Sequence, residues 1–252
     1  MTEASRKYTD TNDGPLDISS RVLSVVIPCF NEKDWVEQLV AAVEAAETPG
    51  VHKELVIVDD CSNDGTRDIL KQYENRHKVV YKQSNGGKGS ALREGFKHAT
   101  GDFIIIQDAD LEYDPREYMR LLQPMIEGRA DVVYGSRFRD GSPRHVLHWF
   151  HYLGNKGMTY VSNFATGLYL TDQATCYRLF RREVLDSFKH KLVSNHFGID
   201  PELTAYVARG RWRFYEVGIS YHARGTVQGK KITMKDGFAA VWHIIRFNFF
   251  TK

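Results

Sequence analysis

Three acidic residues within a five-residue stretch are the part of this chain best suited to chemistry. Asp108-Ala109-Asp110 closes the apolar run 103–107, and Glu112 follows two residues later. Side chains alternate along a strand, so Asp108 and Asp110 are expected to point the same way where the strand ends. An all-oxygen ligand set suits Mg²⁺ or Mn²⁺ bridging phosphate oxygens better than Zn²⁺. We therefore expect a metal site at Asp108, Asp110 and Glu112, and a substrate that carries a diphosphate.

An acidic pair after a strand can also have a purely structural role. It can cap the next helix or simply face water. Phosphatases with an aspartate nucleophile also carry Asp-x-Asp after a strand, but usually on the first strand and followed by Thr or Val and then Leu. Here the pair follows the fourth expected strand and precedes Leu111-Glu112, which disfavours that class.

Two further polar segments follow expected strands. In the segment 59–66, Asp60 can accept hydrogen bonds from base N–H or ribose hydroxyl groups, whereas Asp64 is placed to cap the next helix. In the segment 28–32, Pro28 gives a rigid exit, Phe30 an aromatic ring that can equally be core, and Glu32 a carboxylate. Both segments are candidates for holding a nucleoside.

The glycine-rich segment 85–90 is not a standard phosphate-binding loop. Lys88 is followed by Gly89 rather than Ser or Thr, and Leu92 stands where G-x-G-x-x-G needs its last glycine. We interpret the segment as a loop at the edge of the site, from which Lys88 can reach an anionic ligand.

These loops are positioned by alternating strands and helices, which predict an α/β fold with a mostly parallel central sheet and helices on both faces. Ligands then gather at the carboxyl ends of the strands. An aromatic-rich helical segment over 145–169 and an amphipathic helix over 236–250 are expected after the fifth strand. The expected strands are 22–27, 54–58, 78–82, 103–107, 131–135 and 212–221, and the earlier helices are 35–46, 66–75 and 90–99.

The composition describes a globular chain without a dominant charge. Its 252 residues are 42% hydrophobic, and 34 basic against 32 acidic residues give a net charge of +2, which argues against nucleic acid as a partner. Three cysteines without paired spacing indicate neither a disulfide framework nor a zinc site, and they fit a reducing cytosol. Neither a signal peptide nor a spanning helix is expected. Residues 1–20 read as a mobile N-terminal arm, and the oligomeric state is left open.

Several motifs follow one another along the chain, at 28–32, 58–66, 108–112, 135–138, 172–185, and 215–221 with Arg224 and Lys230. This ordered set resembles family 2 glycosyltransferases with the GT-A fold, and most of all the dolichyl- and polyprenyl-phosphate sugar synthases. The resemblance spans roughly residues 22–235, which makes 21–235 the expected catalytic domain and 236–252 a C-terminal helix. Its departures are Phe30 for a usual Tyr, Glu112 for a frequent Gln and Gly218 for a frequent Pro.

The resemblance implies roles for individual residues. Those matching nucleoside-binding positions are Pro28, Phe30, Glu32, Val58 and Asp60. Those matching the donor and metal positions are Asp108, Ala109 and Asp110, with Glu112 as a further metal ligand. The cations matching donor and acceptor phosphate positions are Arg137, Arg224 and Lys230. The metal would offset charge on the leaving diphosphate, and Arg137 would hold oxygens in a bidentate manner.

The acceptor is the less defined side of the reaction. Asp200 and Glu202 stand where related transferases carry an acidic motif that serves as a base for a hydroxyl acceptor, although both can also cap a helix. Arg178 and Arg182 are expected to share a strand face, either as a solvated edge or as a site for a lipid phosphate. The C-terminal helix, with Trp242, Phe249 and Phe250, suits a membrane interface or packing onto the domain.

The sequence therefore predicts a metal-dependent inverting hexosyltransferase. It would move a sugar from a nucleotide sugar, of the GDP-mannose or UDP-glucose type, to a polyprenyl or dolichyl phosphate at the cytoplasmic face of a membrane. A transferase that uses a saccharide hydroxyl in a cell-surface glycan is the nearer alternative. A sugar nucleotidyltransferase is a second alternative, but its Gly-rich signature is absent after Ile27. A non-enzymatic membrane-binding module does not explain the polar chemistry of every ligand-facing loop.

Overall fold

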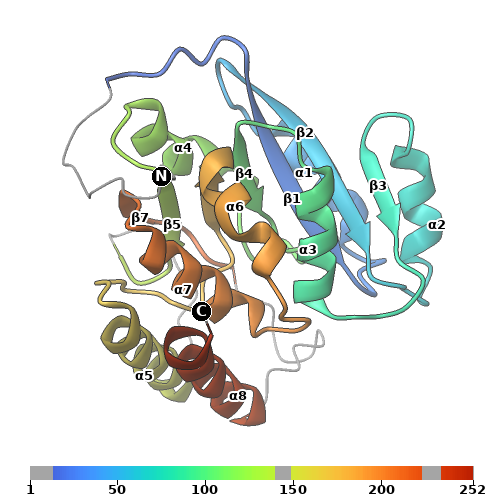
Figure 1. Cartoon of the computed structure of the whole chain (residues 1–252). Helices are drawn as coiled ribbons and strands as arrows, with labels where there is room; N and C mark the ends of the chain where they lie inside the picture. The colour runs from blue at the N-terminus through green and yellow to red at the C-terminus, as the bar shows by residue number, and fades with distance from the viewer. Residues whose placement is uncertain (1–13, 140–148, 223–233, 252) are drawn as a thin grey trace.

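A seven-stranded sheet forms the centre of the molecule. The computed structural model describes residues 14–139, 149–222 and 234–251, shown in Figure 1. The strand order is β3-β2-β1-β4-β6-β5-β7, and all neighbours are parallel except β6, which runs antiparallel to β4 and β5. The predicted mostly parallel α/β fold is confirmed. The strands are β1 (Arg21–Cys29), β2 (Val51–Asp59), β3 (Lys78–Tyr81), β4 (Phe103–Ile106), β5 (Val132–Ser136), β6 (Arg178–Arg181) and β7 (Phe214–Gly218).

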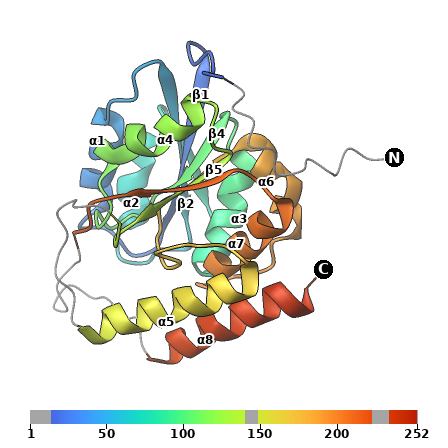
Figure 2. The ribbon, with the colours of Figure 1, turned by 90° about the vertical axis from the view of Figure 1, so that its left-hand side faces the viewer.

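Helices cover both faces of the sheet and add one further layer. Figure 2 shows α1 and α4 on one side of the sheet and α3, α6 and α7 on the other, with α5 and α8 side by side beneath them. The α-helices are α1 (Val36–Ala45), α2 (Thr66–Leu70), α3 (Lys88–His98), α4 (Tyr118–Ile126), α5 (Trp149–Thr166), α6 (Arg182–Phe188), α7 (Ile199–Gly210) and α8 (Met234–Ile245). Shorter turns are η1 (Lys71–Tyr73), η2 (Pro115–Glu117), η3 (Lys189–Lys191) and the π-helical η5 (Arg246–Phe250).

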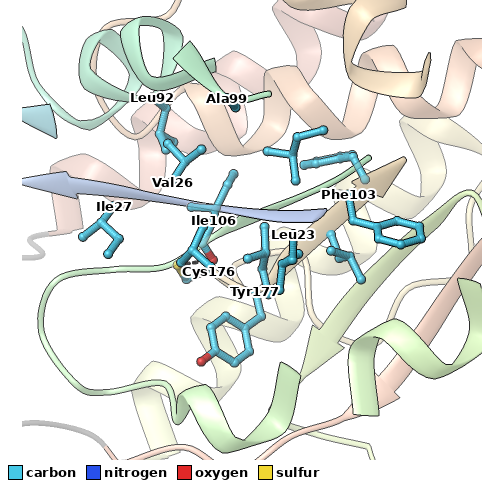
Figure 3. Close-up of a cluster of buried hydrophobic side chains, with 14 of the residues drawn as sticks. Leu23, Val26, Ile27, Leu92, Ala99, Phe103, Ile106, Cys176 and Tyr177 are labelled. Atoms are coloured by element: carbon cyan, nitrogen blue, oxygen red, sulfur yellow. Dashed lines mark hydrogen bonds between the residues drawn. The ribbon is translucent and has the colours of Figure 1, made fainter. Parts of the chain in front are cut away.

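The central strands are buried because they are apolar on both faces, as a covered parallel sheet requires. Figure 3 shows Val26 of β1 directed toward Leu92 of α3, and Ile27 on the opposite face. A Cβ at Gly95 would collide with Val26, so this glycine lets α3 lie close to the sheet. This packing holds α3, whose first residue is Lys88, against the sheet.

Several element boundaries differ from the sequence expectations. Strand β1 runs through Pro28 to Cys29 instead of stopping before the proline. The helix expected over 66–75 is α2 followed by the 3₁₀ turn η1. The C-terminal helix begins at Met234, two residues early, and ends in a π-helical turn. Residues 145–148 of the expected helix 145–169 lie outside the described residues.

The described part of the expected N-terminal arm packs on the domain. The backbone N–H of Leu16 donates to the carbonyl of Ile126 at 2.7 Å, and Leu16 and Ile18 lie against the core. Both side chains are half-buried. Leu16 and Ile18 of the arm expected over 1–20 thus contact the domain, and residues 1–13 lie outside the described residues.

The three cysteines are unpaired in the structure, as expected. Within residues 14–139, 149–222 and 234–251, we find no helix whose length and apolar character would let it traverse a bilayer.

Candidate active site

The loops after β1, β2 and β4 meet at one edge of the sheet, as the sequence predicts. The register pairs Cys29 with Asp59 and Val26 with Ile106, so the three strands end close together. The first two loops are also hydrogen-bonded to each other, since Asn31 N–H donates to Ser62 Oγ at 3.0 Å. Asn31, Cys61 and Leu111 adopt positive φ angles of 56°, 64° and 56°, one in each loop. Such backbone conformations are costly for residues other than glycine and concentrate at functional sites.

The side chains at the predicted nucleoside positions range from exposed to fully buried. Phe30 is 45% exposed, which rules out the core alternative and leaves its ring accessible to a base. Pro28 and Glu32 are half-buried beside it, and Val58 is fully buried within β2. Glu32 N–H donates to Thr66 Oγ1 at 2.9 Å, which fixes the loop after β1 against the start of α2.

Asp60 is buried, and its carboxylate is bound by neighbouring protein groups. Its carboxylate accepts hydrogen bonds from Gly86 N–H at 3.0 Å and Gly87 N–H at 2.6 Å, and it forms an ion pair with Lys82. Gly87 has a φ of 83°, and a Cβ there would collide with His196. Asp60 therefore fixes the backbone of the glycine-rich loop 85–90 next to the end of β2.

Asp64 binds the start of α2 as predicted, although it lies one residue before the N-cap position. Its carboxylate accepts from Thr66 N–H at 3.0 Å and from Thr66 Oγ1 at 2.6 Å, while Gly65, with a φ of 105°, is the N-cap. Asp64 is thus the helix-capping residue of this loop rather than a ligand-facing one.

Lys88, which the sequence predicts to reach an anionic ligand, contacts a carboxylate of the acidic turn in this structure. Its Nζ lies 2.7 Å from Asp108 Oδ1, and both side chains are largely buried. Burial opposes ionisation of Asp108, but the Lys88 charge and hydrogen bonds from Lys88 and Cys176 outweigh it and lower the pKa of Asp108. Burial also opposes the Lys88 charge, but Asp108 outweighs it and raises the pKa of Lys88. Both groups are charged at neutral pH.

The acidic turn follows β4, which ends at Ile106, and its residues differ in burial. Asp108 and Asp110 are half-buried, whereas Ala109 and Glu112 are buried. Asp110 Oδ1 accepts from Glu112 N–H at 3.1 Å. Glu112 itself is buried, and its Oε2 accepts from the Tyr221 hydroxyl at 2.8 Å.

The predicted ligand set of three carboxylates is not assembled in this structure. Among the described residues, no group of three or more His, Cys, Asp or Glu side chains is arranged to hold a metal ion. The Tyr221 contact explains why Glu112 does not join the two aspartates. Asp108 and Asp110 still provide half-buried carboxylate oxygens, which fit a hard cation whose other ligands come from phosphate and water.

A buried polar network supports the acidic turn from below, and the sequence patterns did not predict it. Gln107 Oε1 accepts from the hydroxyls of Tyr118 at 2.7 Å and Tyr177 at 2.8 Å. Gln107 Nε2 donates to the carbonyl of Asp108 at 3.0 Å. Tyr113 Oη accepts from Cys176 N–H at 3.1 Å. The one available signal was a glutamine directly after four apolar strand residues, since a buried amide needs partners.

Arg137 is not presented to solvent as the predicted phosphate fork. Its Nε and Nη2 lie 2.7 and 2.8 Å from the two carboxylate oxygens of Asp172, and both residues are buried. The guanidinium also lies 5.1 Å from the centre of the Tyr221 ring. Burial opposes its charge, but Asp172 outweighs burial and raises the pKa of Arg137. The expected bidentate partner is thus an internal carboxylate in this structure.

Arg178 and Arg182 do not share a face, so that prediction is wrong. Arg178 is fully buried in β6 and forms an ion pair with Asp200, while its Nη2 donates to the carbonyl of Gln173 at 2.8 Å. Arg182 is the first residue of α6 and donates to the carbonyls of Ala99 and Gly101. The reason is that β6 ends at Arg181, so strand alternation does not reach Arg182.

Asp200 and Glu202 both lie in the first turn of α7 but have different surroundings. Asp200 is half-buried and paired with Arg178. Glu202 is fully buried, and its two oxygens accept from the N–H groups of Val193 and Ser194, each at 2.9 Å. Glu202 therefore anchors the loop before α7, which is a structural role like the capping alternative for this pair. Arg224 and Lys230 lie outside the described residues.

The family model for glycosyl transferase family 2 matches residues 24–188, which is more than half of the chain and contains the three loops described above. This chain belongs to glycosyl transferase family 2, and it is a glycosyltransferase by that membership.

Solved structures with the same fold are glucosyl-3-phosphoglycerate synthases from Mycobacterium tuberculosis. A complex with Mn²⁺, UDP-glucose and phosphoglyceric acid is 17% identical, with a TM-score of 0.68, over 90% of this chain and 79% of that one. Complexes with Mn²⁺, UDP and glucosyl-3-phosphoglycerate, and with Mg²⁺ and UDP, are each 18% identical, cover 90% of this chain and 78% of theirs, and have TM-scores of 0.67 and 0.66. The likeness confirms the GT-A fold.

Proposed function

We propose that this protein is a metal-dependent transferase that moves a hexose from a nucleotide diphosphate sugar to the phosphate of a polyprenyl lipid. The proposal combines the family membership with the edge of the sheet where Phe30 and the Asp108–Asp110 turn lie. Solved proteins of the same fold bind UDP or UDP-glucose together with Mn²⁺ or Mg²⁺, which supports a nucleotide sugar and a divalent cation here. The sugar nucleotidyltransferase alternative has no support from these comparisons.

Asp108 and Asp110 would hold the divalent cation, which supplies Lewis-acid stabilisation of the leaving diphosphate when it is bound. Lys88 would release Asp108 as the cation enters, and its ammonium would then face the anionic donor. Gln107 would keep the turn in place through its hydrogen bond to the Asp108 carbonyl. Phe30 would offer its exposed ring to the base, with Pro28 and Glu32 beside it.

The Arg178–Asp200 pair is the observation that favours an anionic acceptor. A hydroxyl acceptor needs a general base, whereas a phosphate monoester is already largely ionised at neutral pH and needs little help. Glu202 has both oxygens occupied by backbone amides, and Asp200 is neutralised by a buried guanidinium. Both acidic residues on the acceptor side are therefore engaged by partners within the protein, which supports an acceptor that needs little base catalysis.

The proposal is tested by incubating the protein with GDP-, UDP- and dTDP-sugars, Mg²⁺ or Mn²⁺, and a short-chain polyprenyl phosphate. Mass spectrometry should detect a lipid-linked hexose, and Asp110→Asn should abolish it while the protein stays folded. A small phosphorylated acid such as phosphoglycerate is the comparison acceptor, because a solved protein of this fold binds it. Transfer to phosphoglycerate but not to the lipid would contradict the acceptor assignment, and full activity of Asp110→Asn would contradict the metal site.

A further inference from the structure

The loop 192–198, which leads from η3 into α7, connects the start of α7 with the start of α3. Figure 1 shows this loop passing the end of α3 that begins at Lys88. It packs on the glycine-rich segment 85–90, which is not a standard phosphate-binding loop. The contact gives these glycines a different explanation.

Two glycines on either side of Lys88 let the loop lie directly on α3. A Cβ at Gly87 would collide with the ring of His196. A Cβ at Gly89 would collide with the carbonyl of Ser194. Gly89 belongs to α3, where an alanine would ordinarily favour the helix. The glycine is therefore explained by the approach of the loop and not by the helix itself.

Hydrogen bonds from α3 hold the loop in this position. Ser90 N–H donates to the carbonyl of Asn195 at 2.9 Å. The Arg93 guanidinium donates to the carbonyl of Leu192 at 3.2 Å and to Asn195 Oδ1 at 2.5 Å. Both donors belong to the first half of α3, so the loop and this part of the helix form one hydrogen-bonded unit.

On the α7 side, one buried carboxylate fixes the same loop. Glu202 lies in the first turn of α7, is fully buried, and accepts from Val193 N–H and Ser194 N–H at 2.9 Å each. Each of its two oxygens serves one amide, and hydrogen bonds to a charged acceptor are stronger than those to a neutral one. Glu202 therefore determines where the loop lies.

Lys88 is the residue whose surroundings depend on this contact. It lies between the two glycines, its Nζ is 2.7 Å from Asp108 Oδ1, and its side chain is largely buried. An ion pair that is shielded from water is stronger than an exposed one. A looser loop would admit water to Lys88 and weaken its contact with Asp108.

We propose that Glu202 is a positioning residue for the donor side of the site. Through the loop 192–198 it holds the start of α3, and with it the contact between Lys88 and Asp108. The inference rests on the proposed cation site at Asp108, and it gives Glu202 a role other than that of a general base. A general base acts on the acceptor and leaves cation binding unchanged, whereas this positioning residue alters it.

The test is the affinity of the nucleotide-free protein for Mn²⁺, measured by calorimetry. In Glu202→Gln, one backbone amide of the loop faces an NH₂ group instead of an oxygen, so the loop loosens and Lys88 competes less for Asp108. Mn²⁺ should bind about threefold more tightly, less than the roughly fivefold gain expected when such an ion pair is lost completely. In a Lys88→Met background, Glu202→Gln should leave the Mn²⁺ affinity unchanged.

Gly89→Ala tests the same contact from the other side. Its Cβ would displace the Ser194 carbonyl, so the affinity for Mn²⁺ should rise as it does in Glu202→Gln. This variant keeps the test decisive if Glu202→Gln does not fold. Gly157→Ala is the control, because it lies in α5 and its Cβ would meet nothing within 4 Å.

Glu54→Gln is the matched control for Glu202→Gln. The Glu54 carboxylate also accepts from two consecutive backbone amides, those of Thr100 and Gly101. These residues precede β4 and so lie at the end of that strand remote from the acidic turn. Glu54→Gln should lower the urea midpoint without changing the affinity for Mn²⁺, and circular dichroism should show that every variant is folded.

A second measurement does not need the metal. Urea unfolding of Glu202→Gln, Lys88→Met and the double variant forms a cycle. The loss of stability in the double variant should be smaller than the sum of the two single losses, because both changes disturb the same contact.

Two outcomes would overturn the inference. One is a Mn²⁺ affinity of Glu202→Gln and Gly89→Ala equal to that of the wild type, and the other is additive losses in the urea cycle. A lower kcat of Glu202→Gln with unchanged Mn²⁺ affinity would make this residue a general base instead. If no variant binds Mn²⁺, the proposed metal site fails and the urea cycle alone decides whether Glu202 positions Lys88. Failure of the acceptor assignment would appear as absent transfer to the polyprenyl phosphate and would alter neither readout.

Discussion

Four cations that surround the site are each paired with a carboxylate. The pairs are Lys82 with Asp60, Lys88 with Asp108, Arg137 with Asp172 and Arg178 with Asp200. Charges that are removed from water need such partners, and a ligand that uses one member must compete with the other. Asp60 and Asp108 lie on the donor side, and their partners Lys82 and Lys88 flank or belong to the glycine-rich segment. An arriving nucleotide and cation would therefore rearrange these two ion pairs.

Replacing Lys88 should tighten binding of a cation alone. In Lys88→Met, the ammonium no longer competes for Asp108 Oδ1, and the affinity for Mn²⁺ in calorimetry without nucleotide should rise about fivefold, the equivalent of about 1 kcal/mol for a partly exposed ion pair. Lys97→Met removes an exposed lysine of the same helix and is the control. Equal Mn²⁺ affinities for the wild type and Lys88→Met would show that the two cations do not compete.

Arg137 should prove to be a determinant of stability. Arg137→Met leaves Asp172 as an unpaired buried carboxylate, and the free energy of unfolding in urea should fall by about 3–5 kcal/mol. The double variant Arg137→Met/Asp172→Leu should recover part of the loss, because no charge is then buried alone. A single variant with unchanged stability and a raised KM for the nucleotide sugar would instead make Arg137 a ligand of the donor.

The variant Asp200→Asn distinguishes a phosphate acceptor from a hydroxyl acceptor. With a polyprenyl phosphate, Asp200→Asn should lower kcat by less than about tenfold, because an ionised phosphate needs little general-base help. A base for a hydroxyl acceptor would cost about 10²–10⁴-fold when removed. Initial rates at saturating donor decide between the two values, with Asp110→Asn as the inactive reference.

At the scale of elements, the sequence predicts the alternating strands and helices, but it does not predict features that depend on pairing between distant segments. The first four strands and their helices follow from apolar runs and polar turns, and the convergence of the loops follows from the parallel sheet. The insertion of antiparallel β6 between β4 and β5 depends on long-range pairing, which no local pattern encodes. The separation of Arg178 from Arg182 follows from the same cause, because the end of β6 is set by its pairing.

The candidate site shows the same division. The sequence predicts the residue types and the position of the acidic turn, because these are local properties of the chain. It does not predict the hydrogen-bond and ion-pair partners of the site residues, since Tyr221 binds Glu112 and Asp172 binds Arg137 across more than 30 residues of chain. Gln107 was missed because the partners of its side chain include Tyr113, Tyr118 and Tyr177, which lie 6, 11 and 70 residues further along the chain.

The attachment of α8 should weaken at low pH. Burial, and then the neighbouring Arg246, lower the pKa of His243 from its usual value of 6.5, although Glu202 acts in the opposite sense. Because the unfolded chain binds this proton more readily than the folded chain, protonation of His243 lowers the free energy of unfolding as the pH falls from about 6.5 through the folded pKa. Above about pH 6.5, His243 does not change the free energy of unfolding. Urea unfolding from pH 7.5 to 5.0 should show a smaller pH-dependent loss for His243→Gln than for wild type. His52→Gln, at an exposed histidine, should match wild type, and identical profiles for all three proteins would contradict the assignment.

For the whole molecule, the fold places two surfaces next to each other. One contains Arg178 and Asp200 on the acceptor side, and the other is formed by α5 and α8, joined to the first through Gln173 and Gly198. This arrangement is the reason to treat the acceptor, rather than the donor, as the central question.

The most direct measurement compares polyprenyl phosphate with the matching polyprenol as acceptors, using one nucleotide sugar and Mn²⁺ under the same conditions. The two lipids differ only in the phosphate, so their ratio of kcat/KM reports whether the enzyme requires an anionic acceptor. We predict that the phosphate is preferred by at least about 100-fold, because an ionised phosphate needs little base catalysis and the two acidic residues on the acceptor side, Asp200 and Glu202, are engaged by protein groups. Equal rates with the two lipids, or transfer to the polyprenol alone, would contradict this prediction.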